Sequence, residues 1–224
     1  MAYPFVPESE TIARHFLSAL RRSHILETPY RRWTLTDVFP ESLCTAILVL
    51  PIAPPVLGDT DGTRDTYNKS RAFFTPELRA DFPACAALSE ALQRPDVARQ
   101  FGETLQFDPN GTFLRIEYIQ DLDGAWLEPH RDVPEKIFSL VLYLCTGPHA
   151  VDWGTDIYDD DKKWVGRSKA EFNTAAIFKA GHNTWHGFDK RPIVGVRRLM
   201  EVNYVRGWRD REQLVYPDKP ITTT

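Results

Sequence analysis

Cysteine is scarce in this 224-residue sequence, and its distribution excludes two kinds of site. The chain has three cysteines, Cys44, Cys85 and Cys145, which lie far apart and include no Cys-x-x-Cys pair. An odd number of widely spaced cysteines argues against a disulfide framework and against a cysteine-ligated metal site. We therefore expect buried thiols in a reducing compartment.

Excess charge of one sign and long apolar runs are absent as well. The formal net charge is −4 and the pI is about 5.9, which argues against binding to nucleic acid. The longest apolar run, residues 46–57, is interrupted by prolines and is too short to cross a bilayer. The first residues lack the basic and apolar regions of a secretory signal. We expect a cytoplasmic protein with no nucleic-acid or membrane partner.

The sequence does contain enough apolar material for one folded domain. Hydrophobic residues make up 42% and aromatic residues 12% of a chain whose length is typical of a single domain. The pattern of apolar residues changes from helical spacing to short strand-like runs near residue 110. Within a single domain, 1–224, we expect a helix-rich part with supporting strands (1–110), a jelly-roll catalytic core (111–210) and a C-terminal tail (211–224).

The spacing of apolar residues predicts the secondary structure. Helical spacing predicts helices over residues 9–25, from Pro40 onward, over 75–92 and over 95–104. Short apolar runs between turn residues predict strands over 30–35, 113–119, 137–145, 150–158, 174–178 and 198–205. The Pro-, Gly- and Asp-rich stretch 51–64 is predicted to be a loop. Closely spaced strands are typical of sandwiches and barrels, so we expect a mostly β fold with an antiparallel jelly-roll core and helices packed on one outer face.

A His-x-Asp triplet, formed by His130 and Asp132, is the first sign of chemistry. Residues two apart in a strand point the same way, so an imidazole and a carboxylate can aim at one point. Such a triplet is expected by chance about half the time in a chain of this composition, so alone it carries little weight. A second imidazole, His186, follows a predicted buried strand. Two imidazoles and one carboxylate can occupy one face of an Fe(II) octahedron and leave three positions open.

The order of these motifs resembles a known family. The sequence resembles the 2-oxoglutarate/Fe(II) dioxygenase superfamily, in its prolyl-4-hydroxylase-like branch. The elements that carry the resemblance are, in order, a tyrosine-bearing strand, the His-x-Asp triplet, a strand ending Tyr-Leu at 143–144, the distal histidine and a Gly-x-Arg at 195–197. The resemblance covers residues 113–208, a little under half of the chain. It implies a double-stranded β-helix, which is a form of jelly roll, and the use of Fe(II), 2-oxoglutarate and O2 in a hydroxylation.

The resemblance also implies roles for individual residues. His130, Asp132 and His186 would bind the catalytic iron, and Arg197 would pair with the distal carboxylate of 2-oxoglutarate. A guanidinium suits that role because it can grip a carboxylate through two parallel hydrogen bonds. Strand alternation sends Arg197 and Arg198 to opposite faces, so only one of them can enter the barrel. The Gly-x-Arg spacing favours Arg197.

Two tyrosines match positions at which related hydroxylases place phenols near the cosubstrate, namely Tyr118 and Tyr143. A buried tyrosine is more often a core aromatic with a satisfied hydroxyl. One departure from the family pattern concerns the cosubstrate. Many members carry serine or threonine two positions after the arginine as a second carboxylate contact, whereas this chain has Leu199 there, or Met200 if Arg198 is the ligand.

Other functions compete with this interpretation. His182 and His186 are spaced for zinc on a helix, but a zincin needs glutamate after the first histidine, where this chain has Asn183. A cupin-type binding protein or sugar isomerase that uses His130 as a base would need neither a carboxylate at position 132 nor 2-oxoglutarate. A halogenase would leave the carboxylate position vacant, and Asp132 fills it.

The sequence leaves the substrate and the oligomeric state open. The resemblance implies a peptidyl residue as the substrate, with a small molecule or a saccharide precursor as alternatives. One fold supports many substrates, so fold analogy does not decide among them.

Overall fold

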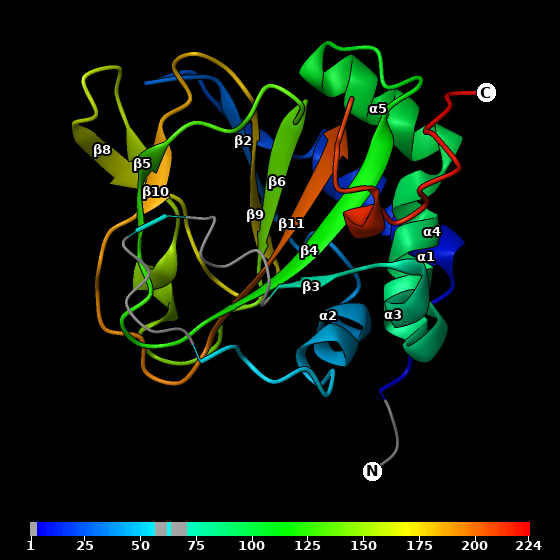
Figure 1. Ribbon diagram of the computed structural model, residues 1–224, viewed down its shortest axis with the longest axis horizontal. Helices are drawn as coiled ribbons and strands as arrows, with labels where there is room; N and C mark the ends of the chain where they lie inside the picture. The colour runs from blue at the N-terminus through cyan, green and yellow to red at the C-terminus, as the bar shows by residue number, and fades with distance from the viewer. Residues whose placement is uncertain (1–3, 57–61, 64–70) are drawn as a thin grey trace.

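The structure is a computed structural model that describes residues 4–56, 62–63 and 71–224. Its strands form two antiparallel sheets, and the helices lie along one side of the larger sheet (Figure 1). The prediction of a mostly β fold with helices on one face is confirmed.

The larger sheet combines strands from both halves of the chain. In spatial order its described strands are β1 (His24–Leu26), β2 (Arg32–Thr36), β9 (Thr174–Lys179), β6 (Phe138–Tyr143), β11 (Arg197–Val205), β4 (Phe113–Asp121) and β3 (Ala72–Phe73). β4 and β11 pair along their whole length, which places Asp121 directly opposite Arg197.

The smaller sheet brings two distant histidines together. Its described strands are, in spatial order, β5 (Leu127–His130), β10 (His186–Phe188), β7 (Asp156–Tyr158) and β8 (Trp164–Arg167). β5 pairs with β10 so that His130 lies opposite His186. On the other side of β10, Ile157 of β7 lies opposite His186. The central position of β10 therefore fixes the backbone of His186 from both sides.

Helices cover the outer face of the larger sheet. They are α1 (Ser9–Arg21), α2 (Glu41–Leu48), α3 (Pro76–Asp81), α4 (Pro83–Gln93) and α5 (Pro95–Leu105), and 3-10 turns follow at Ala150–Trp153 and Arg211–Gln213. Alternate side chains of the sheet, such as Ile116, Leu140 and Val202, share the main apolar core with Phe16 of α1 and Phe101 of α5. Each fully buried side chain of this size contributes about 1.5–3 kcal/mol to folding. No helix in the described part of the chain combines the length and apolarity needed to cross a membrane.

The inner face of the larger sheet is more polar. Residues of opposite parity in the same strands, such as Ser139 and Val141 in β6 and Arg197 and Glu201 in β11, line the space between the two sheets. A smaller apolar cluster that includes Val141, Phe178 and Phe188 closes this space on one side. Alternation along each strand thus separates a dry outer core from an inner face that carries ionisable groups.

Several predicted elements differ in the structure. The helix predicted over 75–92 is two helices, because Pro83 lacks an N–H and disfavours helical backbone in the residue before it. The first helix ends at Arg21, so His24 begins β1 instead of ending a helix. The strand predicted over 150–158 starts as a 3-10 turn and is extended only at Asp156–Tyr158. Of the loop predicted over 51–64, residues 57–61 and 64 lie outside the described residues.

The C-terminal segment and the cysteines belong to the folded core. Val215 and Ile221, in the stretch predicted as a tail, are completely buried. The three cysteines are free and buried, as predicted. Burial raises the pKa of the Cys44 and Cys85 thiols to about 12 and also raises that of Cys145.

Candidate metal centre and cosubstrate pocket

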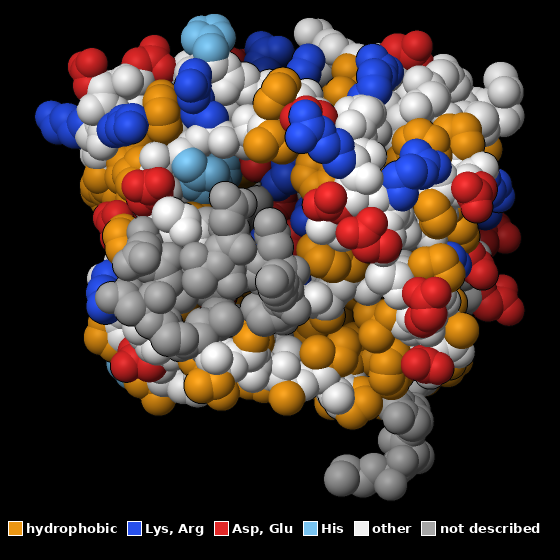
Figure 2. Space-filling view, in the orientation of Figure 1, with side chains coloured by type: hydrophobic (Ala, Val, Ile, Leu, Met, Phe, Trp, Pro, Cys, Tyr) orange, Lys and Arg blue, Asp and Glu red, His pale blue; other side chains and the backbone are white. Residues whose placement is uncertain are grey.

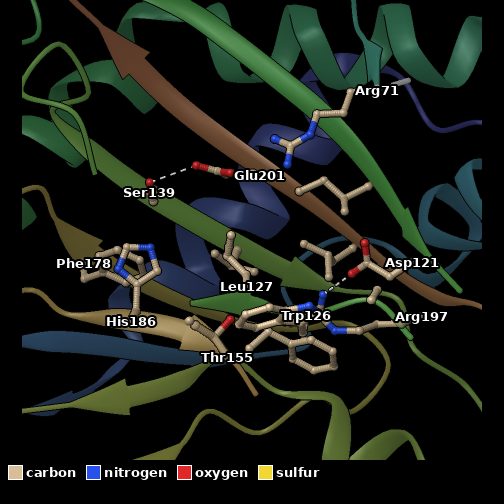
Figure 3. Close-up of a pocket in the computed structure, with 16 residues that line it drawn as sticks. Arg71, Asp121, Trp126, Leu127, Ser139, Thr155, Phe178, His186, Arg197 and Glu201 are labelled. Atoms are coloured by element: carbon tan, nitrogen blue, oxygen red, sulfur yellow. Dashed lines mark hydrogen bonds and ion pairs between the residues drawn. The ribbon is translucent and has the colours of Figure 1, made fainter. Parts of the chain in front are cut away.

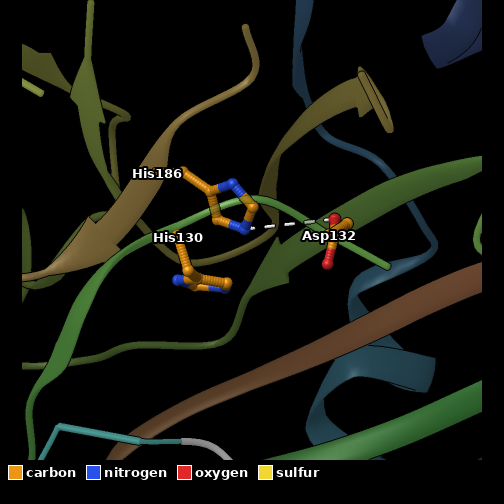
Figure 4. Close-up of side chains that lie close together, drawn as sticks. All are labelled: His130, Asp132 and His186. Atoms are coloured by element: carbon orange, nitrogen blue, oxygen red, sulfur yellow. Dashed lines mark ion pairs between the residues drawn. The ribbon is translucent and has the colours of Figure 1, made fainter. Parts of the chain in front are cut away.

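Three side chains from two distant segments of the chain lie close together. His130 ends β5, Asp132 follows it by two residues, and His186 begins β10 (Figure 4). The two imidazole centroids lie 4.3 Å apart, and Nε2 of His186 lies 4.0 Å from Oδ2 of Asp132. One potential ligand atom from each residue lies within 4.8 Å of the other two, and no other group of this kind occurs among the described residues. The structure therefore brings together the three residues that the sequence predicts as iron ligands.

Hydrogen bonds fix the tautomers of both histidines. Nδ1 of His130 lies 2.9 Å from the carbonyl oxygen of Glu128, and Nδ1 of His186 lies 2.9 Å from that of Thr184. A carbonyl oxygen only accepts, so both Nδ1 atoms carry the proton. In the neutral imidazoles the lone pair is then on Nε2, which is the arrangement that metal-binding histidines use.

The third residue, Asp132, is held by two donors. Its Oδ1 accepts a hydrogen bond from Nζ of Lys136 at 2.9 Å, and its Oδ2 accepts one from the Ser139 hydroxyl at 2.7 Å. Lys136 also contacts Glu201, whose Oε1 lies 3.1 Å from the Ser139 hydroxyl. The Asp132, Lys136 and Glu201 side chains are at most 3% exposed. Two buried carboxylates thus contact the same ammonium, which holds both in place.

The buried polar network continues away from Asp132 along the inner face. Asn203 donates to Glu201 at 3.1 Å and accepts from Arg115 at 2.9 Å. Arg115 donates to Glu117 at 2.8 Å, and Arg71 forms an ion pair with the same carboxylate. Each group in the network has a charged or hydrogen-bonding neighbour, which buried ionisable groups require.

An inner pocket extends from His186 to Arg197 (Figure 3). His186 and Glu201 line the part of the pocket near the metal-ligand cluster, and Arg197 and Asp121 line another part of it. The apolar part of its wall includes Val141, Phe178, Phe188 and Leu199, and Thr155 contributes a hydroxyl. A pocket with a buried guanidinium beside a potential metal centre suits a small acid that chelates the metal at its other end.

Arg197, and not Arg198, enters this pocket. Its side chain is 7% exposed, its Nε donates to the carbonyl oxygen of Trp153 at 2.7 Å, and its guanidinium forms an ion pair with Asp121. Arg198 points to the other face, where its Nε donates to Gln120 at 3.2 Å. Strand alternation sends the two side chains to opposite faces, and Arg197, which the Gly-x-Arg spacing favoured, is the one that points inward.

Of the two predicted tyrosines, Tyr118 and Tyr143, only Tyr143 lies near the inner pocket. Tyr118 points to the outer face of β4 and packs in the core beneath the helices, so the prediction that it contacts the cosubstrate is wrong. Tyr143 points inward but sits behind the pocket wall, where its hydroxyl donates to Thr155 at 2.6 Å. Thr155 is therefore the residue that reaches the pocket, and Tyr143 orients its hydroxyl.

A larger pocket opens on the other side of the metal-ligand cluster. It has a volume of about 480 Å3, and His130 and Asp132 form part of its wall. Its charged lining residues are of both signs: Arg71, Arg115, Arg131, Lys136, Glu128, Asp132 and Asp210. Basic and acidic side chains are also interspersed over the face shown in Figure 2. This outer pocket adjoins two of the three residues of the cluster, and His186 lines the inner pocket.

The sequence reasoning missed several residues of the site. Glu201 shares the inner face of β11 with Arg197 because the two are four residues apart, so strand period could have found it. Lys136 and Asp121 carried no such signal, because their contacts depend on how the strands pair. His182, considered with His186 for zinc, is exposed and outside the metal-ligand cluster.

Comparisons with known proteins bear on the fold. No family model and no curated protein matches the sequence. A prolyl-4-hydroxylase from Pseudomonas putida has a TM-score of 0.55 at 16% identity, over 92% of this chain and 99% of that chain. A prolyl 4-hydroxylase from Phytophthora capsici has a TM-score of 0.59 at 12% identity, over 91% and 67% of the two chains. SnoK, a non-heme α-ketoglutarate-dependent carbocyclase from nogalamycin biosynthesis, has a TM-score of 0.53 at 10% identity, over 90% and 87%. The chain therefore has the fold of 2-oxoglutarate/Fe(II) oxygenases.

Proposed function

We propose that this protein is an Fe(II)- and 2-oxoglutarate-dependent dioxygenase that hydroxylates its substrate. In this proposal the two facing sheets form a double-stranded β-helix, and His130, Asp132 and His186 hold the iron. Arg197 binds the distal carboxylate of 2-oxoglutarate in the inner pocket. The fold of the structural neighbours and the placement of these four residues support the proposal.

One observation carries the proposal. Two imidazoles whose Nδ1 atoms donate to backbone carbonyls meet a buried carboxylate, and their ligand atoms lie within 4.8 Å of one another. Two histidines and one carboxylate with open positions are the donor set of non-haem Fe(II) oxygenases. The sugar-isomerase alternative needs one histidine as a base and gives no reason for this convergence.

The protein residues supply geometry and charge. When bound, the metal and cosubstrate would couple reduction of O2 to oxidation of a substrate C–H bond, converting 2-oxoglutarate to succinate and CO2. His130, Asp132 and His186 would fix the metal. Lys136 and Ser139 hold the Asp132 carboxylate in one orientation. The apolar wall of the inner pocket would keep water from the cosubstrate, which strengthens its pairing with the arginine.

The substrate remains a peptidyl residue, a small molecule or a saccharide precursor. The outer pocket offers charged side chains of both signs and the exposed rim residues Arg131 and Asp210. The structural neighbours themselves include prolyl hydroxylases and a carbocyclase. A screen that measures succinate release with Fe(II), 2-oxoglutarate and candidate substrates would identify the class.

The test of the proposed function is replacement of Asp132 by alanine. We expect Asp132→Ala to lose Fe(II) binding and Fe(II)-dependent succinate production. Asp161→Ala, in an exposed turn, removes the same charge and should leave both properties unchanged. Fe(II) binding and succinate production that persist in Asp132→Ala would rule out the assignment.

A further inference from the structure

The strongest unassigned feature of the inner pocket is a carboxylate, Asp121, beside its arginine. Asp121 ends β4 and lies directly opposite Arg197 in the β4–β11 pairing. Its Oδ2 accepts a hydrogen bond from NH1 of Arg197, and both side chains border the pocket (Figure 3). The contact is therefore fixed by the sheet and does not depend on a mobile loop.

We infer that Asp121 is a specificity-determining residue that weakens the grip of Arg197 on the distal carboxylate of a 2-oxo acid. This inference rests on the proposed function. An arginine that already pairs with a carboxylate offers one edge fewer to a second carboxylate. The negative charge of Asp121 also repels a carboxylate that binds to the same guanidinium.

Arg197 does not need Asp121 to keep its orientation. Its Nε donates to the Trp153 carbonyl oxygen at 2.7 Å. Its guanidinium carbon lies 4.0 Å from the centroid of the Phe188 ring, which supports one face of the group. With Nε and one face already held, the principal effect of Asp121 is on charge.

The rest of the pocket gives the distal carboxylate little compensation. Leu199 stands where a second hydroxyl contact would be, and it is apolar. Thr155 offers one hydroxyl, which accepts from Tyr143 at 2.6 Å and can donate its single proton to a carboxylate. The Arg197–Asp121 pair is neutral as a unit, so the pocket discriminates less between dicarboxylic and monocarboxylic 2-oxo acids than a lone arginine would.

The effect of removing the charge follows from this arrangement. Asp121→Asn keeps an oxygen that can accept from Arg197 but removes the negative charge. We expect 2-oxoglutarate to bind roughly tenfold more tightly, a modest share of the Coulomb interaction between close charges at the edge of a protein interior. 2-Oxobutyrate, which has the same chelating end but no distal carboxylate, should bind with unchanged affinity.

The experiment is calorimetric binding of 2-oxoglutarate and 2-oxobutyrate to Ni(II)-loaded protein, in which no turnover occurs. The proteins compared are wild type, Asp121→Asn and Asp121→Ala, with Asp123→Asn as the control. Asp123 is exposed, accepts a hydrogen bond from the backbone N–H of Ile193, and does not line the pocket. Thermal unfolding checks that each variant is folded, and the alanine variant carries the test if the asparagine variant is not.

The inference is supported if the Asp121 variants bind 2-oxoglutarate more tightly than wild type and Asp123→Asn do, while their affinity for 2-oxobutyrate is unchanged. Unchanged or weaker binding, or an equal gain for 2-oxobutyrate, overturns it and leaves the proposed function intact. Ni(II)-loaded wild type and Asp121 variants that bind neither 2-oxo acid would instead contradict the proposed function, and this inference with it.

Discussion

Lys136 offers a sharp test of the electrostatics around Asp132. Its ammonium is 3% exposed and contacts the carboxylates of Asp132 and Glu201, each 2% exposed. Lys136→Met keeps an unbranched apolar stem and removes the charge. The two carboxylates would then lose the ammonium that they share, in a position from which water is largely excluded.

The magnitude follows from burial. Breaking a buried ion pair by removing one partner typically costs 3–5 kcal/mol, about the size expected here. In a chain of this length each kcal/mol corresponds to roughly 2–4 °C, so the melting temperature of metal-free protein should fall by roughly 6–20 °C. A divalent cation restores the missing positive charge. We therefore expect metal to stabilise the variant more than it stabilises wild type.

The assay is thermal unfolding of metal-free protein and of protein titrated with Mn(II), a redox-stable substitute for Fe(II). Lys163→Met, which removes an exposed ammonium from a turn, is the matched control and should behave as wild type. A metal-free Lys136→Met variant as stable as wild type would refute the reasoning. So would a variant whose melting temperature Mn(II) raises no more than that of wild type.

Two further predictions concern the pocket arginine and the smaller sheet. Arg197→Ala should raise the 2-oxoglutarate concentration needed for succinate production by tenfold or more while leaving Fe(II) affinity unchanged. Arg198→Ala should leave both properties unchanged. The reverse pattern would assign the 2-oxoglutarate contact to Arg198. Asp156→Asn should lower the free energy of unfolding at neutral pH by about 3–5 kcal/mol, because Asp156 is fully buried and pairs with Arg167 and Arg191. Burial raises the pKa of Asp156, but hydrogen bonds from the Asp189 N–H, Trp164 and Arg167 outweigh it, so its pKa is lowered. The stabilisation is therefore present above about pH 3.9 and is lost as the pH falls through the lowered pKa. Melting temperatures of wild type and variant should converge in acid, and a gap that persists there would contradict this account.

The sequence predicted the metal-ligand cluster because its signal is local chemistry. His130 and Asp132 share a face of the chain through spacing alone, and His186 is one of few histidines in a buried-looking context. Strand alternation also separated Arg197 from Arg198 before the strand pairing was known. These features depend on residue type and parity, which the sequence contains.

The sequence-based predictions failed where the alternation of side chains along a strand was not applied, or where the position of a residue depends on pairing between distant strands. Tyr118 alternates with Glu117 and Ile119 and shares its parity with Leu114 and Ile116, so it belongs to the apolar face beneath the helices. The short strands β5 and β10 carry little propensity of their own, because Pro129 and Gly187 interrupt them. They form through pairing between distant segments, β5 with β10 and β10 also with β7.

Buried charge partners lay beyond sequence reasoning for the same reason. Nothing near Lys136 in the sequence shows that its ammonium reaches Glu201, which lies 65 residues away. Asp121 was not among the predicted site residues, yet the pairing of β4 with β11 places it against Arg197. The chemistry of the inner pocket thus depends on register, which no local pattern in either strand reveals.

The most direct test of the central claim is iron-edge anomalous scattering from crystals grown anaerobically with Fe(II). The account predicts one strong anomalous peak within bonding distance of Nε2 of His130, Nε2 of His186 and a carboxylate oxygen of Asp132. A peak located elsewhere, or no peak at this position despite bound iron in solution, would contradict the account.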